Sequence, residues 1–226
     1  MNKQIWVIAN WKNNKTIAEA LSWVDVVGPK LSSSSKVKIV VCPTDIAIEG
    51  VKKAVMVGNY PMLVGSQDIS AFDTGAYTGE EAARLLKDVV DLSILGHSER
   101  RENLGETDEM VAEKVMRARE ANIIPLVCVQ NENTPIPEGV NLVAYEPVFA
   151  IGSGNPDTPE NAGSVAAKLK ERYKDTEVLY GGSVTWENTE MFLAQPDING
   201  LLIGKASLDP EGFLKIIEVA CKGTYE

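Results

Sequence analysis

The sequence has one histidine and three cysteines, and this scarcity excludes several kinds of site. A metal centre built from several histidines is excluded, because His97 is the only one in the chain. Cys42, Cys128 and Cys221 are odd in number, and no two lie close enough in sequence for a zinc knuckle. We therefore expect neither a metal site nor a disulfide framework. Such cysteine usage is typical of a reducing cytosol, which predicts a cytoplasmic protein.

Positive charge and long apolar runs are scarce as well. The 22 lysine and arginine residues are outnumbered by 32 aspartate and glutamate residues, which gives a formal net charge of −10. This balance argues against nucleic acid or an anionic membrane as a partner, and an anionic small molecule would need a locally positive pocket. No apolar run is long enough to span a membrane. Residues 1–3 lead directly into the first apolar run, so we expect no signal peptide and no membrane association.

The apolar residues form eight short runs that alternate with segments of helical periodicity. We expect strands at residues 5–9, 37–42, 62–65, 92–95, 123–129, 140–145, 178–180 and 200–203. We expect helices at residues 16–31, 45–55, 107–121, 158–172, 186–194 and 210–219. Thr78 and Glu81 have the spacing of a capping box, which predicts a further helix that reaches about Val89.

This alternation predicts the fold. Nearly continuous apolar strands between helices indicate a parallel sheet that is covered on its outside. Eight such units in 226 residues favour a single domain, residues 1–226, with the fold class α/β and a closed (β/α)8 or TIM barrel rather than an open sheet. In such a barrel the functional residues gather at the carboxyl ends of the strands.

The connection between the fifth and sixth strands is unusually short. Only residues 130–139 separate these strands, and they include Pro135 and Pro137. A parallel crossover normally needs about a dozen residues or more, and proline interrupts helices. We therefore expect the helix between strands five and six to be shortened or absent.

Polar residues and glycines cluster just after the predicted strands, at the same end of the predicted barrel. They are Asn10, Lys12, His97, Glu99, Glu146, Ser183, Gly204 and Lys205. Residues 181–183 and 204–205 are either tight turns or a phosphate site built from backbone amides, which barrels often form after their last two strands. The coincidence of these residues makes this end the candidate site.

Glu146 ends the sixth predicted strand and precedes a loop with two glycines. Pro147 turns the chain at once and keeps Glu146 out of the helical region. The pattern is that of a fixed acid or base followed by a flap, and the amides of residues 152–154 are suited to an anion. The alternative is an ordinary loop between a strand and a helix, with a solvated glutamate.

His97 and Lys12 each have a structural and a functional interpretation. A lone histidine is often structural, but His97 follows a strand end, and residues 98–101 can start a helical turn beside it. A helix amino terminus disfavours the imidazolium cation, so we expect a neutral ring that donates a hydrogen bond. Lysine is commonly a surface residue, but Lys12 lies just past a strand end beside Asn10, where an ammonium can bind anionic charge.

Six motifs follow one another along almost the whole chain. They occupy residues 9–12, 75–80, 96–101, 145–152, 180–184 and 206–208, and include Ala-Asn-Trp-Lys, Gly-His-Ser-Glu-Arg-Arg and Tyr-Gly-Gly-Ser-Val. In content and order they resemble the triosephosphate isomerase family. The resemblance implies interconversion of dihydroxyacetone phosphate and glyceraldehyde 3-phosphate, a step of glycolysis and gluconeogenesis that needs no cofactor and no metal.

The resemblance also implies a role for each residue. Glu146 would be the base that moves a proton between two carbons, and a neutral His97 would polarise the carbonyl; this enzyme is itself a known example of such pKa tuning. Lys12 and Asn10 would stabilise the enediolate, and Glu99 would be a partner of the lysine or a proton relay. The phosphate would be held by Gly152, Ser183, Gly204 and Lys205, under a lid formed by residues 147–157.

Some features bear on assembly or depart from the family pattern. In dimeric relatives a loop tip, matched here by Thr78, enters the neighbouring subunit, so the resemblance implies a homodimer. A missing fifth helix is typical of short, archaeal-like members and leaves a tetramer as the alternative. Phe149 stands where the lid commonly has tryptophan, and Lys205 stands where a second glycine is common, which adds an ammonium near the phosphate.

Two other functions are compatible with the predicted fold. A metal-dependent phosphosugar epimerase would need several histidines and acids as ligands, and the chain has one histidine. A catalytically silent binding protein would be expected to lack at least one of Lys12, His97 and Glu146, and all three are present.

Overall fold

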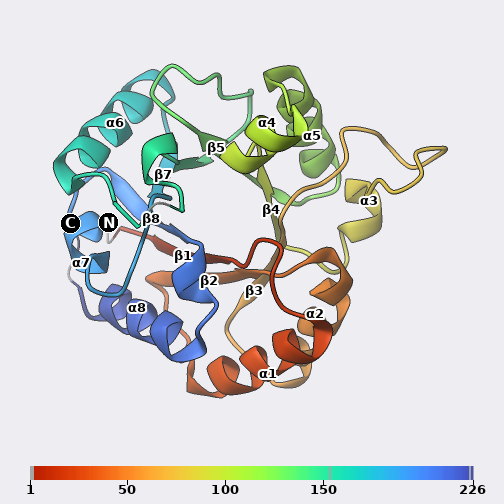
Figure 1. Cartoon of the computed structure of the whole chain (residues 1–226), viewed down its shortest axis with the longest axis horizontal. Coiled ribbons are helices and arrows are strands. Elements are labelled where there is room, and N and C mark those ends of the chain that lie inside the picture. The colour runs from red at the N-terminus through yellow and green to blue at the C-terminus, as the bar shows by residue number, and fades with distance from the viewer. Residues whose placement is uncertain (1–2, 153, 224, 226) are drawn as a thin grey trace.

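The computed structural model describes residues 3–152, 154–223 and 225, and these residues form a closed barrel of eight parallel strands (Figure 1). The strands are neighbours in chain order, and the last pairs with the first. They are β1 Ile5–Asn10, β2 Val37–Cys42, β3 Leu63–Ser66, β4 Leu92–Leu95, β5 Ile124–Val129, β6 Leu142–Tyr145, β7 Glu177–Tyr180 and β8 Ile198–Ile203. The predicted (β/α)8 fold is confirmed.

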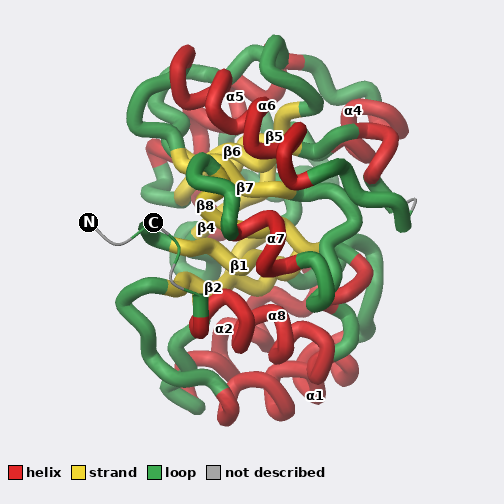
Figure 2. The backbone as a smooth tube through the Cα atoms, turned by 90° about the vertical axis from the view of Figure 1, so that its left-hand side faces the viewer, coloured by secondary structure: helices red, strands yellow, loops and turns green. Residues whose placement is uncertain are grey.

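The helices lie outside this barrel, as Figure 2 shows by colour. They are α1 Ile17–Val27, α2 Ile48–Val57, α3 Ala83–Leu86, α4 Ser98–Leu104, α5 Asp108–Glu120, α6 Pro159–Arg172, α7 Thr189–Leu193 and α8 Pro210–Lys222. Single turns of 3-10 helix occur at Gly28–Lys30, Asp45–Ala47, Val148–Ala150 and Lys205–Ser207. None of the helices in the described part of the chain is long and apolar enough to cross a membrane.

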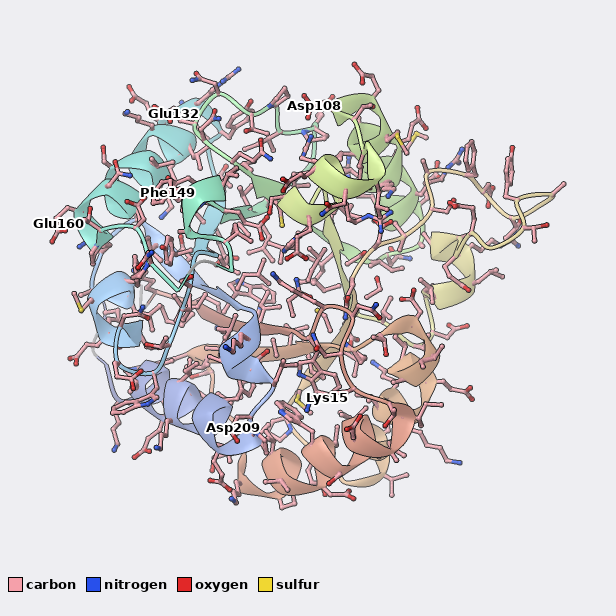
Figure 3. All side chains as sticks on the ribbon, in the orientation of Figure 1. Lys15, Asp108, Glu132, Phe149, Glu160 and Asp209 are labelled. Atoms are coloured by element: carbon pink, nitrogen blue, oxygen red, sulfur yellow. The ribbon has the colours of Figure 1, made fainter. Side chains whose placement is uncertain are left out.

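The strands are apolar at successive positions because both of their faces are covered. In β1, Trp6 and Ile8 belong to the cluster inside the barrel, whereas Ile5, Val7 and Ala9 belong to the larger cluster between the barrel and the helices. Successive side chains of a strand point to opposite faces, so both faces need apolar residues. Figure 3 shows side chains filling the centre of the ring of strands, which is therefore a packed core.

Threonine and aspartate caps define where several helices begin. Thr16 and Glu19 form a reciprocal capping box at the start of α1. The side chains of Thr107, Thr158 and Asp209 each accept a hydrogen bond from a backbone N–H in the first turn of α5, α6 and α8. These contacts are local, since each hydrogen bond lies within one helical turn.

The capping box predicted at Thr78 is wrong. α3 begins at Ala83, ends at Leu86, and has no side-chain cap. Gly79 has a φ of +91°, which is incompatible with a helix that starts at Thr78. The chain after Gly79 is instead held by Ser70, whose N–H donates to the carbonyl of Glu81 at 2.9 Å and whose hydroxyl donates to Glu80 at 2.6 Å.

The helix expected at residues 186–194 is shorter in the structure, where α7 begins at Thr189. The side chain of Asn188 explains the late start. It accepts a hydrogen bond from the Thr185 N–H at 2.8 Å and donates one to the Ser183 carbonyl at 3.1 Å, which closes a turn before the helix.

The connection between β5 and β6 contains no helix, as predicted. It crosses the outside of the barrel as an irregular strap with Ile136 buried beneath it. The N–H of Ile136 donates to the Tyr173 hydroxyl at 3.4 Å, and the Arg119 guanidinium donates to the Glu138 carbonyl at 3.4 Å. Side chains next to the flanking helices α5 and α6 thus hold the strap in the place of an outer helix.

Candidate active site

A cavity of about 750 Å³ opens at the carboxyl ends of the strands. Its lining brings together residues that follow β1, β4, β6, β7 and β8 with the loop after β6. It includes every substrate-facing residue that the sequence predicted: Asn10, Lys12, His97, Glu146, Gly152, Ser183, Gly204 and Lys205. Glu99 lies behind this lining and contacts Lys12.

Glu146 follows β6 directly, and its side chain is almost completely buried, with 1% of the residue exposed. One carboxylate oxygen, Oε2, accepts a hydrogen bond from the Ser98 N–H at 3.1 Å. The other, Oε1, lies 3.0 Å from Nε2 of His97. The alternative of a solvated glutamate is wrong, because the side chain is buried and both carboxylate oxygens contact protein groups.

The charge state of Glu146 is set by these neighbours. Burial is the largest single effect and raises the pKa of Glu146, whereas His97 lowers it through its positive charge and its hydrogen bond. The Ser98 N–H and the Lys12 ammonium lower the pKa of Glu146 further, so it ends below its ordinary value. The carboxylate is therefore ionised at neutral pH, in spite of its burial.

His97 is the N-cap residue of α4, whose start at Ser98 confirms the predicted helical turn. Nδ1 of His97 accepts a hydrogen bond from the Glu99 N–H at 3.2 Å. A ring nitrogen that accepts a hydrogen bond carries no proton, so in the neutral ring the proton lies on Nε2, which faces Glu146. The amino terminus of α4 thus selects the tautomer that points a donor into the cavity.

The pKa of His97 responds to two opposing effects. Burial is the largest single effect and lowers this pKa, whereas the charge and hydrogen bond of Glu146, with a smaller effect of Glu99, raise it, and the net direction is upward from the ordinary value. The upward direction belongs to the arrangement in which Glu146 contacts Nε2. The hydrogen bond from the Glu99 N–H to Nδ1 acts the other way, because only the neutral ring can accept it.

The backbone of Lys12 is left-handed, with a φ of 52°, a conformation that is unfavourable for residues other than glycine. Its N–H donates to Asn10 Oδ1 at 3.0 Å, and its carbonyl accepts from Gln67 Nε2 at 2.8 Å. The Gln67 amide also donates to the Cys42 carbonyl at 3.1 Å. Gln67 was missed by the sequence reasoning, although its position just after β3 was a signal that could have found it.

The side chain of Lys12 lies between Glu99 and the end of β8. Nζ lies 2.5 Å from Glu99 Oε1, which matches the lysine-partner alternative for Glu99. A Cβ atom at Gly204 would lie 3.4 Å from Cε of Lys12, so this side chain passes directly beside the end of β8. Lys205 is exposed at the rim, and within the described residues its ammonium has no ion-pair or hydrogen-bond partner.

Ser183 connects the loop after β7 to the loop after β6. Its hydroxyl donates to the Ala150 carbonyl at 2.5 Å and accepts from the Gly154 N–H at 3.2 Å. Its φ is 50°, a second left-handed residue in the lining. Because the hydroxyl is engaged with the loop, the backbone N–H of Ser183 is the group that remains for an anion.

The loop after β6 forms one wall of the cavity through Ile151, Gly152 and Gly154. Before it, Val148 and Phe149 are 54% and 63% exposed, so their apolar side chains face solvent. Gly152 and Gly154 have φ values of 64° and 78°, which other residues rarely adopt. We call residues 147–157 the lid from here on.

Comparison with known proteins agrees with this geometry. A model of the triosephosphate isomerase family matches residues 5–140 and 137–220. The chain belongs to the triosephosphate isomerase family. It is accordingly an enzyme of the isomerase class.

Several triosephosphate isomerases are similar over almost their whole length. The protein of Dehalococcoides mccartyi (strain ATCC BAA-2266 / KCTC 15142 / 195) is 36% identical, over 96% of this chain and 98% of the relative. The protein of Alkaliphilus metalliredigens (strain QYMF) is 34% identical, over 96% and 99%. The crystal structure of triosephosphate isomerase from Bartonella henselae has a TM-score of 0.84 at 28% identity, and the match covers 97% of this chain and 100% of that one.

The match to the family is divided at the strap between β5 and β6. The two segments that match the triosephosphate isomerase family overlap at residues 137–140, which lie within this strap. The alignment with the Dehalococcoides relative runs over 247 positions, more than the 226 residues of this chain, so parts of that relative have no counterpart here.

Proposed function

We propose that this chain interconverts dihydroxyacetone phosphate and D-glyceraldehyde 3-phosphate through an enediolate, without a cofactor. The family supports the reaction, which belongs to glycolysis. The observation that carries the mechanism is the convergence of three groups in one cavity: the Glu146 carboxylate, the His97 ring and the Lys12 ammonium. These supply a base, a hydrogen-bond donor and a positive charge to one small substrate.

Glu146 is the base in this proposal. It removes a proton from the carbon beside the substrate carbonyl and returns it to the neighbouring carbon, which converts the ketose into the aldose. Its lowered pKa keeps it ionised, so it is ready to accept a proton. In the free enzyme both oxygens are engaged, by the Ser98 N–H and by His97, so the carboxylate has to leave these partners to reach the substrate.

His97 polarises the carbonyl through Nε2–H. When substrate separates the ring from Glu146, the main effect that raises the pKa of His97 is removed, and burial together with the Lys12 charge outweighs the smaller effect of Glu99 and keeps the ring neutral. A neutral donor stabilises the developing oxyanion without carrying a full charge through the reaction.

Lys12 and Asn10 stabilise the enediolate oxygens. The Lys12 ammonium provides the local positive charge that a chain of net charge −10 needs for an anionic substrate. Glu99 holds this ammonium at 2.5 Å, and Asn10 and Gln67 hold its strained backbone. A side chain held in this way is positioned before substrate arrives, which reduces the cost of orientation in the transition state.

The phosphate lies at the opposite end of the cavity, at the amides of Gly152, Ser183 and Gly204. Backbone N–H groups at the start of a helical turn suit an anion, and Gly204 directly precedes the turn Lys205–Ser207. Lys205 adds an ammonium at the rim. The lid closes this end and excludes water, since the enediolate otherwise loses its phosphate.

The chain forms a homodimer through the loop before α3 in this proposal. This loop projects from the barrel on the right in Figure 1, and Phe72 and Tyr77 stack within it at 4.3 Å between ring centres. A second cavity of about 540 Å³ lies beside the Lys12 loop, lined by Asn14, Thr44, Gln67 and their neighbours. A loop tip with Thr78 from a second copy fits such a cavity, and a tetramer is the alternative.

We also propose that the protein is cytoplasmic. All three cysteines are unpaired, which is typical of proteins in a reducing compartment.

A coupled isomerase assay in both directions, with and without a metal chelator, tests the proposed function. We expect turnover of both triose phosphates that the chelator leaves unchanged. Loss of turnover on chelation would favour a metal-dependent phosphosugar enzyme. Binding of triose phosphate without any turnover would favour a catalytically silent protein, and either result would overturn the proposal.

A further inference from the structure

The end of the lid carries a buried carboxylate that the proposed mechanism does not use. Asp157 is 8% exposed, although the lid residues before it, Gly154 to Pro156, are exposed. A buried carboxylate is unfavourable unless hydrogen bonds compensate for its lost hydration. Its contacts therefore indicate what holds the lid at this end.

Asp157 is hydrogen-bonded to three different parts of the barrel. Oδ2 accepts from the Tyr145 hydroxyl at 3.2 Å, at the end of β6, and from Asn161 Nδ2 at 2.7 Å, in the first turn of α6. Oδ1 accepts from the Thr158 N–H at 2.8 Å. The N–H of Asp157 donates to the Tyr180 hydroxyl, at the end of β7, at 2.7 Å.

The two tyrosines are suited to permanent contacts of this kind. Tyr145 is 5% exposed and Tyr180 is completely buried. Burial raises the pKa of Tyr145, and the Asp157 carboxylate raises it further, so the hydroxyl stays protonated and continues to donate. Tyr145 is the last residue of β6 and lies two residues before the lid begins at Pro147. The hydrogen bond between Tyr145 and Asp157 therefore joins the two ends of the lid.

The position of Asp157 is transmitted to the part of the lid that faces the cavity. Gly154 lies three residues before it, and the Gly154 N–H donates to Ser183 at 3.2 Å. Pro156 lies between these two contacts and has a fixed φ, so it limits the backbone conformations that the chain can adopt between them. A shift of Asp157 therefore displaces the glycine amides that face the phosphate end.

We infer that Asp157 is a positioning residue for the isomerase reaction: its carboxylate fixes the carboxyl end of the lid, so that the lid stays over the substrate while the enediolate exists. This inference rests on the proposed function. Asp157 does not touch the substrate and acts through the lid.

A loosely held lid has a chemical signature. When the enediolate phosphate is released from the cavity, the bond from carbon to the phosphate oxygen breaks and the electron pair leaves with the oxygen. The products are inorganic phosphate and an enol, which tautomerises to methylglyoxal, and no further reactant is needed. The ratio of methylglyoxal to isomerised product thus reports how well the lid holds the intermediate.

The structure provides a matched control for the helix that follows. Thr158 is the N-cap of α6, since its hydroxyl accepts from the Asn161 N–H at 3.2 Å. Thr158→Ala removes this cap and leaves the four contacts of Asp157 in place. It therefore destabilises the start of α6 without releasing the lid.

The experiment compares the purified full-length chain with Asp157→Ala, Asp157→Asn and Thr158→Ala. Amide hydrogen exchange of lid peptides measures the anchoring independently of turnover. The methylglyoxal ratio and kcat/KM measure its consequence in reaction, and Tm measures stability. Asparagine at position 157 keeps an oxygen that can accept from Tyr145, so this variant tests rescue by a conservative change.

We expect Asp157→Ala to raise lid exchange and to raise the methylglyoxal ratio ~10- to 100-fold, the range that small misplacements produce in active sites. Asp157→Asn should give an intermediate ratio, and Thr158→Ala should lower Tm with the parental ratio and parental lid exchange. Parental lid exchange in Asp157→Ala would overturn the inference, whatever the activity. Faster exchange with an unchanged ratio would also overturn it, because the anchor would then not serve the reaction. An unaltered chain that exchanges normally but does not isomerise would contradict the proposed function instead, and with it the positioning role, although the anchoring would stand.

Discussion

His97 is the only histidine of the chain, so its titration can be followed by NMR without overlap from any other imidazole. Burial lowers its pKa, and the Glu146 carboxylate 3.0 Å from Nε2 is the main group that raises it, so that the net direction is upward. In Glu146→Gln the main raising charge is lost, while burial and the Lys12 charge, which lower the pKa of His97, and the smaller raising effect of Glu99 remain. We therefore predict that the pKa of His97 lies above its usual 6.5 in the parent and falls below the parental value in the variant.

The same shift predicts a pH dependence of stability. A histidine whose folded pKa is raised contributes stability that is fully present below its unfolded pKa and is lost as the pH rises through the folded pKa. The parent should lose this contribution above about pH 6.5, and Glu146→Gln should not show the loss. Denaturant unfolding at several pH values checks this, and identical profiles for the two proteins would contradict the coupling of His97 to Glu146.

The two lysines of the cavity are predicted to differ in importance. Lys12→Met should lower kcat/KM ~10²-fold or more, because it removes a positioned charge at the reacting oxygens. Lys205→Gly should lower it less than about fivefold, because Lys205 is an exposed ammonium at the rim. Steady-state kinetics on both variants decides this. Equal losses would mean that Lys205 has taken over the role assigned to Lys12.

At the scale of residues, the sequence predicted which groups meet in the cavity, because the ends of all the strands meet at one end of a parallel barrel. It did not predict how they are held. The contact of Gln67 with the Lys12 carbonyl, the engagement of the Ser183 hydroxyl by the lid and the contacts of Asp157 join loops that are distant in sequence. Such contacts depend on the final geometry of the barrel.

At the scale of elements, the sequence indicates local contacts such as helix caps, but not the long-range contacts that compete with them. Thr16, Thr107 and Thr158 cap the predicted helices, since each bond lies within one turn. Thr78 has the same kind of signal and no helix follows it directly. Hydrogen bonds from Ser70, earlier in the same loop, hold Glu80 and Glu81, and the helix begins only at Ala83. Spacing alone cannot reveal such a competitor.

Closure of the barrel between β8 and β1 is predicted to depend on Gly200. This residue pairs with Trp6, and a Cβ atom there would lie 2.3 Å from the Trp6 carbonyl oxygen. Gly200→Ala should therefore lower the free energy of unfolding by about 3 kcal/mol, the upper end for overpacking, because backbone cannot move aside as a side chain can.

Gly50, in the first turn of α2, is the matched control. A Cβ atom there would meet only Leu21, at 3.6 Å, which is ordinary contact. Gly50→Ala should raise the free energy of unfolding by about 0.4–1 kcal/mol. Chemical denaturation measures both variants. A Gly200→Ala protein as stable as the parent would show that the strands separate freely at this point.

At the scale of the whole molecule, the barrel tolerates the loss of one outer helix because a short strap covers the same strands. Ile136 is buried under the strap, and Tyr173 and Arg119 bond to its backbone. The sequence predicted the absence of the helix from the length of the connection and its two prolines. It did not predict the strap, whose contacts come from the regions of α5 and α6.

Assembly is predicted to depend on the projecting loop. Light scattering should give twice the mass of one chain for the parent, and Tyr77→Asp, in the projecting loop, should shift the protein towards monomer. Met191→Asp, on α7 at the opposite side of the barrel in Figure 1, is a control at another exposed apolar residue and should remain a dimer. A monomeric parent, or dissociation by both substitutions alike, would contradict the role of the loop.

In the proposed mechanism, Glu146 transfers the proton between the two carbons of the triose phosphate. Isomerisation in D2O, followed by NMR, measures this transfer directly as deuterium incorporation into substrate and product. The parent should incorporate deuterium, and so should Glu160→Gln, whose exposed carboxylate lies outside the cavity (Figure 3). Glu146→Gln should fold normally and lose both isomerisation and incorporation by ~10²–10⁴-fold. Near-parental incorporation in Glu146→Gln would show that another group is the base.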